Sequence, residues 1–91
     1  MSRQVVWTSQ FKKDYKMAMK RNLPIEELDN VIRLLASEIS LPEKYRDHEL
    51  SGNYNGFREC HILSDWLLIY KLQNNNLILS LTRTGTHSDL F

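Results

Sequence analysis

The chain of 91 residues is 42% hydrophobic and 25% charged, with a formal net charge of +1. These fractions are typical of one globular domain and exclude a disordered chain. The small net charge argues against a dedicated binder of free nucleic acid, because such domains are strongly basic. The longest apolar run, residues 66–70, is too short to cross a membrane. The N-terminus resembles no signal peptide and a single cysteine, Cys60, excludes an internal disulfide, so we expect a cytoplasmic protein.

The positive charge is concentrated near the N-terminus. Residues 1–24 contain six of the 12 lysines and arginines but only one of the 11 acidic residues, Asp14. Such an asymmetry indicates contact with a polyanion or with an acidic protein partner.

The first third of the chain predicts one strand followed by two helices. Residues 4–8 are rich in β-branched and aromatic side chains, which is typical of a strand. Ser9 is the expected N-cap of a helix that runs to about residue 21, with three apolar side chains on one face: Phe11, Tyr15 and Ala18. Another face carries Lys12, Lys16 and Lys20. This stripe either follows a phosphate backbone or is a solvated surface, and the sequence leaves both open.

Pro24 opens the second predicted helix, which we expect to end near residue 39. Its apolar positions repeat at intervals of three and four residues: Ile25, Leu28, Ile32, Leu35 and Ile39. The two helices should pack antiparallel as a hairpin. Residues 43–49, which include His48, are highly charged and are expected to form a loop.

Three strands are predicted in the second half, at residues 57–63, 66–72 and 77–82. Residues 64–65 and 73–76 are short connections, which indicate antiparallel hairpins. The element order is β-α-α-β-β-β, and residues 1–91 form a single domain. We therefore predict an α+β fold in which an antiparallel-rich sheet carries a helical hairpin on one face.

The open face of such a sheet is a place for a site, but alternation leaves two positions undecided. In residues 57–63, His61 can face outward or be a hydrogen-bonded core histidine. In the last strand, Arg83 shares parity with Leu79 and Leu81, which would turn it toward the helices. Gly85 suggests that the strand ends or bulges there, which would free Arg83.

The polar candidates suit metal-independent cleavage of RNA. Cleavage by the 2′-hydroxyl needs a base, an acid for the leaving 5′-oxygen and a cation for the charge on phosphorus, and imidazole and guanidinium groups can supply these. No metal or cofactor is required. The candidates are His48, His61, Asp65, Arg83 and His87, with Trp66, Tyr70 and Phe91 as aromatic neighbours.

Three alternatives use the same residues differently. A zinc site would draw on His48, Cys60, His61 and His87, although their spacing matches no familiar zinc motif. A nucleophilic Cys60–His61 pair is disfavoured because neighbouring strand residues point to opposite faces. A binding module whose histidines are merely surface residues stays open.

Four motifs in order along the chain resemble the YafQ branch of the RelE/ParE toxin superfamily. They are residues 47–52 (DHELSG), 56–62 (GFRECHI), 65–70 (DWLLIY) and 83–91 (RTGTHSDLF). The motifs span residues 47–91, about half of the chain, and length and element order match over all of it. The resemblance implies a RelE/ParE-like fold and a type II toxin: an mRNA interferase, which is a ribosome-dependent endoribonuclease that cuts mRNA in the decoding site.

The resemblance also implies roles for seven residues. They are His48, His61, Asp65, Trp66, Arg83, His87 and Phe91. His87 is the expected general acid. The general base is one of His48, His61 or Asp65, and we favour His61. Asp65 competes for the role of turn former between two strands.

The remaining implied roles concern binding. Arg83 would stabilise phosphate charge, and Trp66 and Phe91 would stack on bases or position them. The stripe of Lys12, Lys16 and Lys20 would contact ribosomal RNA, because the ribosome presents the mRNA. Arg58 either holds the loop that carries Asp47 or Glu49, or touches RNA.

The implied partners are the ribosome, mRNA and a cognate antitoxin of DinJ-like type, often acidic and partly disordered when free. Contact with DNA would be indirect, through the antitoxin in a repressor complex, and no membrane is involved. The alternative in the same superfamily is a ParE-like inhibitor of DNA gyrase without nuclease activity, which would not need the three histidines.

Overall fold

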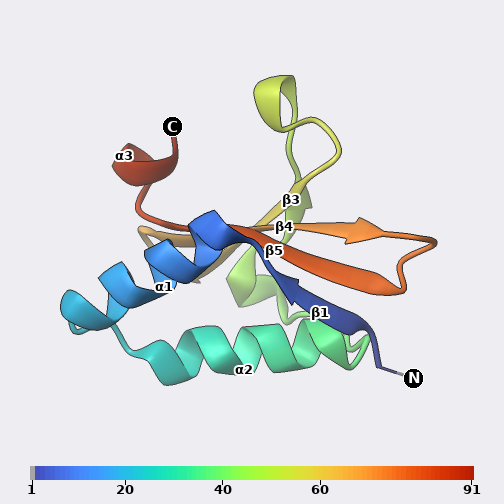
Figure 1. The fold of residues 1–91 in the computed structure, drawn as a ribbon, viewed down its shortest axis with the longest axis horizontal. Coiled ribbons are helices and arrows are strands. Elements are labelled where there is room, and N and C mark those ends of the chain that lie inside the picture. The colour runs from blue at the N-terminus through green and yellow to red at the C-terminus, as the bar shows by residue number, and fades with distance from the viewer. Residues whose placement is uncertain (1) are drawn as a thin grey trace.

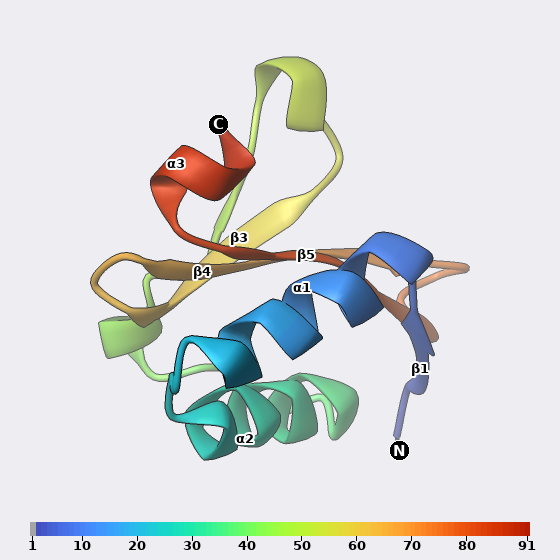
Figure 2. The same cartoon turned by 60° about the vertical axis from the view of Figure 1, so that its left-hand side comes forward.

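The computed structural model describes residues 2–91 and contains one five-stranded sheet with the strand order β1-β5-β4-β3-β2. The long strands are β3 (Arg58–Leu63), β4 (Trp66–Gln73) and β5 (Ile78–Gly85), joined as the two predicted antiparallel hairpins. β1 (Gln4–Trp7) pairs parallel to β5 at one edge. Helices α1 (Ser9–Lys20) and α2 (Ile25–Ala36) cover one face of the sheet, as Figures 1 and 2 show. The predicted α+β architecture is thus confirmed.

The N-cap of helix α1 lies one residue earlier in the chain than predicted. Thr8, not Ser9, is the N-cap: its hydroxyl accepts a hydrogen bond of 3.1 Å from the backbone N–H of Phe11. Thr8 has extended backbone angles at the end of β1, which is the geometry an N-cap needs. Phe11 and Ala18 are buried, so the predicted apolar face of this helix packs on the sheet.

Helix α2 ends at Ala36, three residues before the predicted end. Its last carbonyls are taken by Arg3, whose backbone N–H donates to the Ala36 oxygen at 2.7 Å and whose guanidinium donates to the Leu35 oxygen at 2.6 Å. Glu38 then adopts a left-handed backbone conformation, with φ of 60°, which stops the helix. Ile39 consequently lies 51% exposed outside the helix instead of continuing its apolar stripe.

The structure also contains short elements that the sequence did not predict. Residues 43–49 hold a single 3-10 turn, η1 (Glu43–Tyr45), and the short edge strand β2 (His48–Glu49), which pairs with β3. A second 3-10 turn, η2 (Gly52–Tyr54), and a final helix, α3 (His87–Leu90), lie on the side of the sheet opposite α1 and α2 (Figure 2). Strand β5 reaches Gly85, three residues past its predicted end.

The sheet therefore has a large core on one face and a small one on the other. The main core lies between the sheet and the two long helices, and includes Phe11, Leu28, Trp66 and Leu79. On the opposite face, Leu90 packs with Leu67 and Ile69 to make a second cluster. That face is thus only partly open, and α3 is fixed on it. No helix within residues 2–91 is long and apolar enough to span a membrane.

Candidate active site

Three histidines from separate elements lie in one row on the face opposite the long helices. His48 comes from β2, His61 from β3 and His87 from the first turn of α3. The ring centroids of His48 and His61 are 6.3 Å apart, and those of His61 and His87 are 5.9 Å apart. The pairing of β2 with β3 and the position of α3 over the sheet bring together residues that are up to 39 positions apart in sequence.

Glu59 lies between the first two imidazoles. It is directly opposite His48 in the β2–β3 register and two residues before His61 on the same face of β3. Its Oε1 atom is 3.5 Å from Nε2 of His48 and 3.7 Å from Nε2 of His61. The residue is only 5% exposed, and among the described residues its Oε2 atom has no hydrogen-bond partner. Such a buried carboxylate oxygen is costly, which is typical of a site kept for function.

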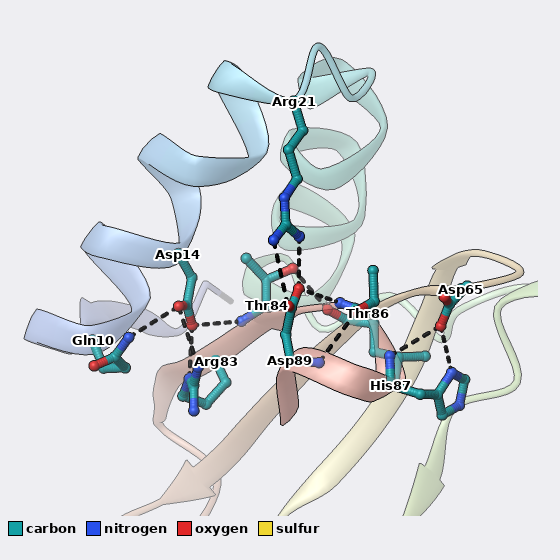
Figure 3. A network of polar contacts seen from close by, with 10 residues as sticks. Gln10, Asp14, Arg21, Asp65, Arg83, Thr84, Thr86, His87 and Asp89 are labelled. Atoms are coloured by element: carbon teal, nitrogen blue, oxygen red, sulfur yellow. Dashed lines mark hydrogen bonds and ion pairs between the residues drawn. The ribbon is translucent and has the colours of Figure 1, made fainter. Parts of the chain in front are cut away.

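His87 is held by Asp65, which lies in the turn between β3 and β4 (Figure 3). One carboxylate oxygen of Asp65 accepts both the backbone N–H of His87, at 2.9 Å, and its ring Nδ1–H, at 2.6 Å. These two hydrogen bonds hold the pKa of Asp65 below its ordinary value, the backbone one most strongly. An ionised carboxylate only accepts hydrogen bonds, so Nδ1 of His87 carries a proton and Nε2 is left for substrate. Asp65 therefore occupies the predicted turn and also contacts a histidine of the site.

Aromatic rings extend the row beyond His87. Phe91 is 63% exposed, with its ring centroid 6.5 Å from that of His87 and 5.4 Å from that of Tyr54. Tyr54 in turn makes an edge contact with Phe57. An exposed ring beside a possible acid offers a surface on which a base can stack.

Arg83 reaches the outer face because of a bulge upstream of it. Leu81 pairs with Tyr70 but Arg83 pairs with Ile69, so Thr82 is an extra residue in β5. This register shift turns Arg83 out of the parity it shared with Leu81, three residues earlier than Gly85, where we expected an interruption. Arg83 is not free, however: its Nε donates to Asp14 of α1 at 2.8 Å (Figure 3). The hydrogen bond to Asp14 raises the pKa of the guanidinium.

Comparison with known proteins identifies the family of this chain. The family model described as the bacterial toxin of type II toxin–antitoxin systems, YafQ, matches residues 3–91. Over 92 aligned residues the chain is 39% identical to the mRNA interferase toxin YafQ of Escherichia coli K12, with 100% of this chain and 98% of that protein covered. The chain belongs to the YafQ family of type II toxins.

Solved structures of the YafQ family have the same fold. The crystal structure of YafQ from Escherichia coli BL21(DE3) has a TM-score of 0.91 to this chain at 39% identity and covers 98% of each chain. YafQ in the Escherichia coli DinJ–YafQ toxin–antitoxin complex has a TM-score of 0.90 at 39% identity, with 100% of this chain and 99% of that one covered. The resemblance seen in the sequence is confirmed, and the gyrase-inhibitor alternative gains no support from these relatives.

Within this YafQ-family fold, Trp66 lies away from the histidine row. It is 2% exposed and belongs to the main core on the side of α1 and α2. Because its ring has no open face for a base, the structure contradicts the stacking role expected for it. Its neighbour in the motif, Asp65, is in the site, since the turn that carries it projects beyond the strands.

The lysine stripe is exposed and separate from the histidines. Lys12, Lys16 and Lys20 are exposed residues of α1, and this helix lies on the face of the sheet opposite to α3 (Figure 2). They can contribute to docking but not to the chemistry at the imidazoles. Cys60 is also remote from that chemistry, because it is fully buried on the helix side, where burial raises the pKa of its thiol. Among residues 2–91, no three His, Cys, Asp or Glu side chains are placed to hold a metal ion.

Arg58 holds the loop before β2, one of its two expected roles. Its guanidinium donates to Asp47 at 3.0 Å and lies 3.6 Å from Glu49. Tyr70 donates a second hydrogen bond to Asp47, at 2.5 Å, from the main core. This network fixes the residue that precedes His48.

Three residues of the site escaped the sequence analysis: Asp14, Tyr54 and Glu59. Glu59 shares strand parity with His61, and a carboxylate among buried strand residues was a usable signal. Asp14 is the one acid among six basic residues, which marked it as an ion-pair partner without indicating which cation it meets. Tyr54 gave no signal, since nothing local shows that η2 folds against α3.

Proposed function

We propose that this YafQ-family toxin is a ribosome-dependent mRNA endoribonuclease that cleaves by metal-independent acid–base catalysis. The observation that carries the proposal is the row of three imidazoles, in which His87 is oriented by a carboxylate and lies beside an exposed aromatic ring. The name of the Escherichia coli relative, an mRNA interferase, supports the same activity.

His87 is the general acid in this mechanism. The substrate 2′-oxygen forms a bond to phosphorus while the bond from phosphorus to the 5′-oxygen breaks, and Nε2 of His87 gives a proton to that leaving oxygen. The products are a 2′,3′-cyclic phosphate and a free 5′-hydroxyl. Asp65 fixes the ring and compensates its positive charge before transfer.

The base that accepts the 2′-proton is the pair of His61 and Glu59. His61 is 5.9 Å from His87 between ring centroids, so both imidazoles can contact one phosphate group. Glu59 is close enough to compensate charge on His61 and on His48. Arg83 lies at the end of β5 just before α3 and stabilises the charge that develops on phosphorus.

Substrate is positioned by surfaces on both sides of the chemistry. Phe91 stacks on a base next to the cleaved bond. Lys12, Lys16 and Lys20 contact ribosomal RNA, so the ribosome supplies most of the affinity for mRNA. This division explains how a chain of net charge +1 acts on RNA in the cytoplasm.

The cognate antitoxin is DinJ-like and neutralises the toxin by binding it. The solved complex of Escherichia coli YafQ with DinJ supports this partner, since the toxin in it has the same fold as this chain. DNA is contacted only through the antitoxin in such a complex.

The test uses purified wild type and His87→Ala added to ribosomes programmed with a short labelled mRNA. We expect cuts at defined positions in the decoding site that require the ribosome, and a fall of at least about 100-fold in the His87→Ala variant. Antitoxin binding by both proteins is the control for folding. Equal cleavage by both would remove His87 from the mechanism, while no cleavage by a folded wild type would return attention to gyrase.

A further inference from the structure

Helix α3 needs outside support to keep its side chains in place. It has only four residues, so it cannot be stable alone, yet it carries His87 and leads directly into Phe91. One support is apolar, because Leu90 is 7% exposed and packs on Leu67 and Ile69. This contact fixes the helix against the sheet but leaves its rotation about that contact unspecified.

Asp89 supplies further support through hydrogen bonds, in addition to the Asp65 carboxylate that accepts the His87 N–H at 2.9 Å. It forms a capping box with Thr86: its carboxylate accepts the Thr86 N–H at 3.0 Å, and the Thr86 hydroxyl accepts the Asp89 N–H at 3.1 Å. The same carboxylate oxygen accepts a hydrogen bond of 2.6 Å from Nη1 of Arg21 (Figure 3). Asp89 therefore links the start of α3 to another part of the molecule.

Gly85 shows how closely this carboxylate is seated. A Cβ atom at Gly85 would lie 2.9 Å from both Cβ and Oδ2 of Asp89, closer than such atoms approach. The glycine is thus required for a close approach and not for an unusual backbone angle. Any side chain here would push Asp89, and α3 with it, away from β5.

Arg21 is the distant end of this link. It is the C-cap of α1, anchored by its own N–H to the Met17 oxygen at 3.0 Å, and it reaches Asp89 across 68 positions of sequence. α1 is packed into the main core through Phe11 and Ala18, so its end is a rigid base. The contact joins the helix layer on one side of the sheet to the catalytic helix on the other.

We propose that Arg21 and Asp89 form a latch that positions His87 and Phe91 for cleavage. The proposal rests on the proposed function in assigning those two residues to the reaction. Neither latch residue touches the reacting atoms, so both are positioning residues. Arg21 acts on the site only through Asp89.

The test compares Arg21→Ala and Arg21→Lys with a matched control, Arg33→Ala. Arg33 is an exposed arginine of α2 that bonds only to Asn30 of the same helix among the described residues, so its removal costs charge but no tertiary link. We expect Arg21→Ala to lower the single-turnover cleavage rate on saturating ribosomes about two- to fivefold, as for an exposed ion pair, with the ribosome concentration for half-maximal rate unchanged. Lysine should restore part of the rate, and Arg33→Ala should match wild type.

A second measurement does not depend on cleavage. The amides of Leu90 and Phe91 bond to the Thr86 and His87 oxygens at 3.1 and 2.9 Å, so their hydrogen exchange reports the order of α3. Arg21→Ala should speed exchange at these amides and leave those of β4 unchanged. Asp89→Asn, which keeps an oxygen for the cap but loses the charge, should do the same.

Two results would overturn the latch: wild-type rate together with wild-type exchange in α3, or faster exchange spread equally over β4 and α3. If wild type itself cleaves nothing, the proposed function fails, but the exchange data still decide whether Arg21 orders α3.

Discussion

Two largely buried carboxylates on different sides of the molecule differ in how many hydrogen bonds they accept. Asp14, with 11% of its side chain exposed, accepts hydrogen bonds from Gln10, from Arg83 and from the backbone N–H of Thr84. Glu59, with 6% exposed, has two imidazole nitrogens at 3.5 and 3.7 Å and one oxygen without a partner among the described residues. A saturated carboxylate holds a structure together, whereas an unsaturated one is available to react.

The same contrast separates the two regions around them. On the side of α1, guanidinium–carboxylate contacts of 2.6 to 2.8 Å join α1 to β5 and α3. Along the histidine row, the Asp65–His87 pair is the one carboxylate contact that short within residues 2–91, and Nδ1 of His48 lies 2.6 Å from the Arg46 carbonyl oxygen. The ion-paired region forms a frame, whereas the contacts of Glu59 with the two imidazoles of the row are longer, at 3.5 and 3.7 Å.

Glu59→Gln should give the largest effect on function with the smallest effect on folding. The amide keeps the shape of the side chain but removes the charge that faces His48 and His61, so we expect cleavage to fall about 100-fold. The free energy of unfolding should stay within about 1 kcal/mol, because no short hydrogen bond is lost. Cleavage kinetics and urea unfolding check the two expectations. Wild-type cleavage by the variant would show that Glu59 is not part of the base.

Asp14→Asn should give the opposite pattern. It removes a carboxylate with several donors, including Arg83, and should cost about 2 kcal/mol of unfolding free energy. Cleavage should also fall, since Arg83 loses the group that orients it. Asp29→Asn is the control, because Asp29 is an exposed helix carboxylate whose side chain accepts a hydrogen bond only from Tyr15 within residues 2–91. Equal stability of the two variants would break the contrast between frame and site.

The sequence predicted the long elements and included most of the residues that the structure brings together in the candidate site, but not their partners. Strands of six to eight residues and helices of twelve have enough repeats to show a period. β2 and α3 are too short to show one, and the extra residue Thr82 leaves no mark in composition. This extra residue reverses the alternation of faces after it, so strict alternation along the strand gives the wrong face for Arg83.

The pairings within the site were beyond local reasoning for a related reason. Asp14 meets Arg83 across 69 positions and Arg21 meets Asp89 across 68, and no spacing rule links such residues. Trp66 shows the opposite problem, because it adjoins Asp65 in the sequence motif but not in the site. Asp65 belongs to a turn and lies in the site, whereas Trp66 begins a strand and lies in the core.

Tyr70→Phe should have a smaller effect that extends to His48. The hydroxyl donates to Asp47 at 2.5 Å, and its loss should cost about 1 kcal/mol of unfolding free energy. Because Asp47 precedes His48, cleavage should fall about two- to threefold. Tyr45→Phe is the matched control: Tyr45 is also buried, and its hydroxyl makes no hydrogen bond to a described residue. Similar losses in both variants would mean that the Asp47 network does not support the histidine row.

The smallest effect tests the frame through pH. The hydrogen bond from Arg21 and those of the capping box lower the pKa of Asp89 to about 2 from an ordinary value near 3.8. A carboxyl whose folded pKa is depressed contributes stability at pH values above its unfolded pKa, and that contribution is lost as pH falls through the folded value. The difference in unfolding free energy between wild type and Asp89→Asn should therefore be constant, at about 1 kcal/mol after screening of an exposed pair, from pH 7 down to about 5. It should shrink between pH 4 and pH 2, as followed by urea unfolding at each pH. In the Arg21→Ala background, the difference in unfolding free energy should reach its low-pH value at a higher pH, because the Asp89 carboxylate protonates at a higher pH without the guanidinium. An unchanged pH dependence would show that the capping box alone sets the pKa of Asp89 and that α1 contributes nothing to it.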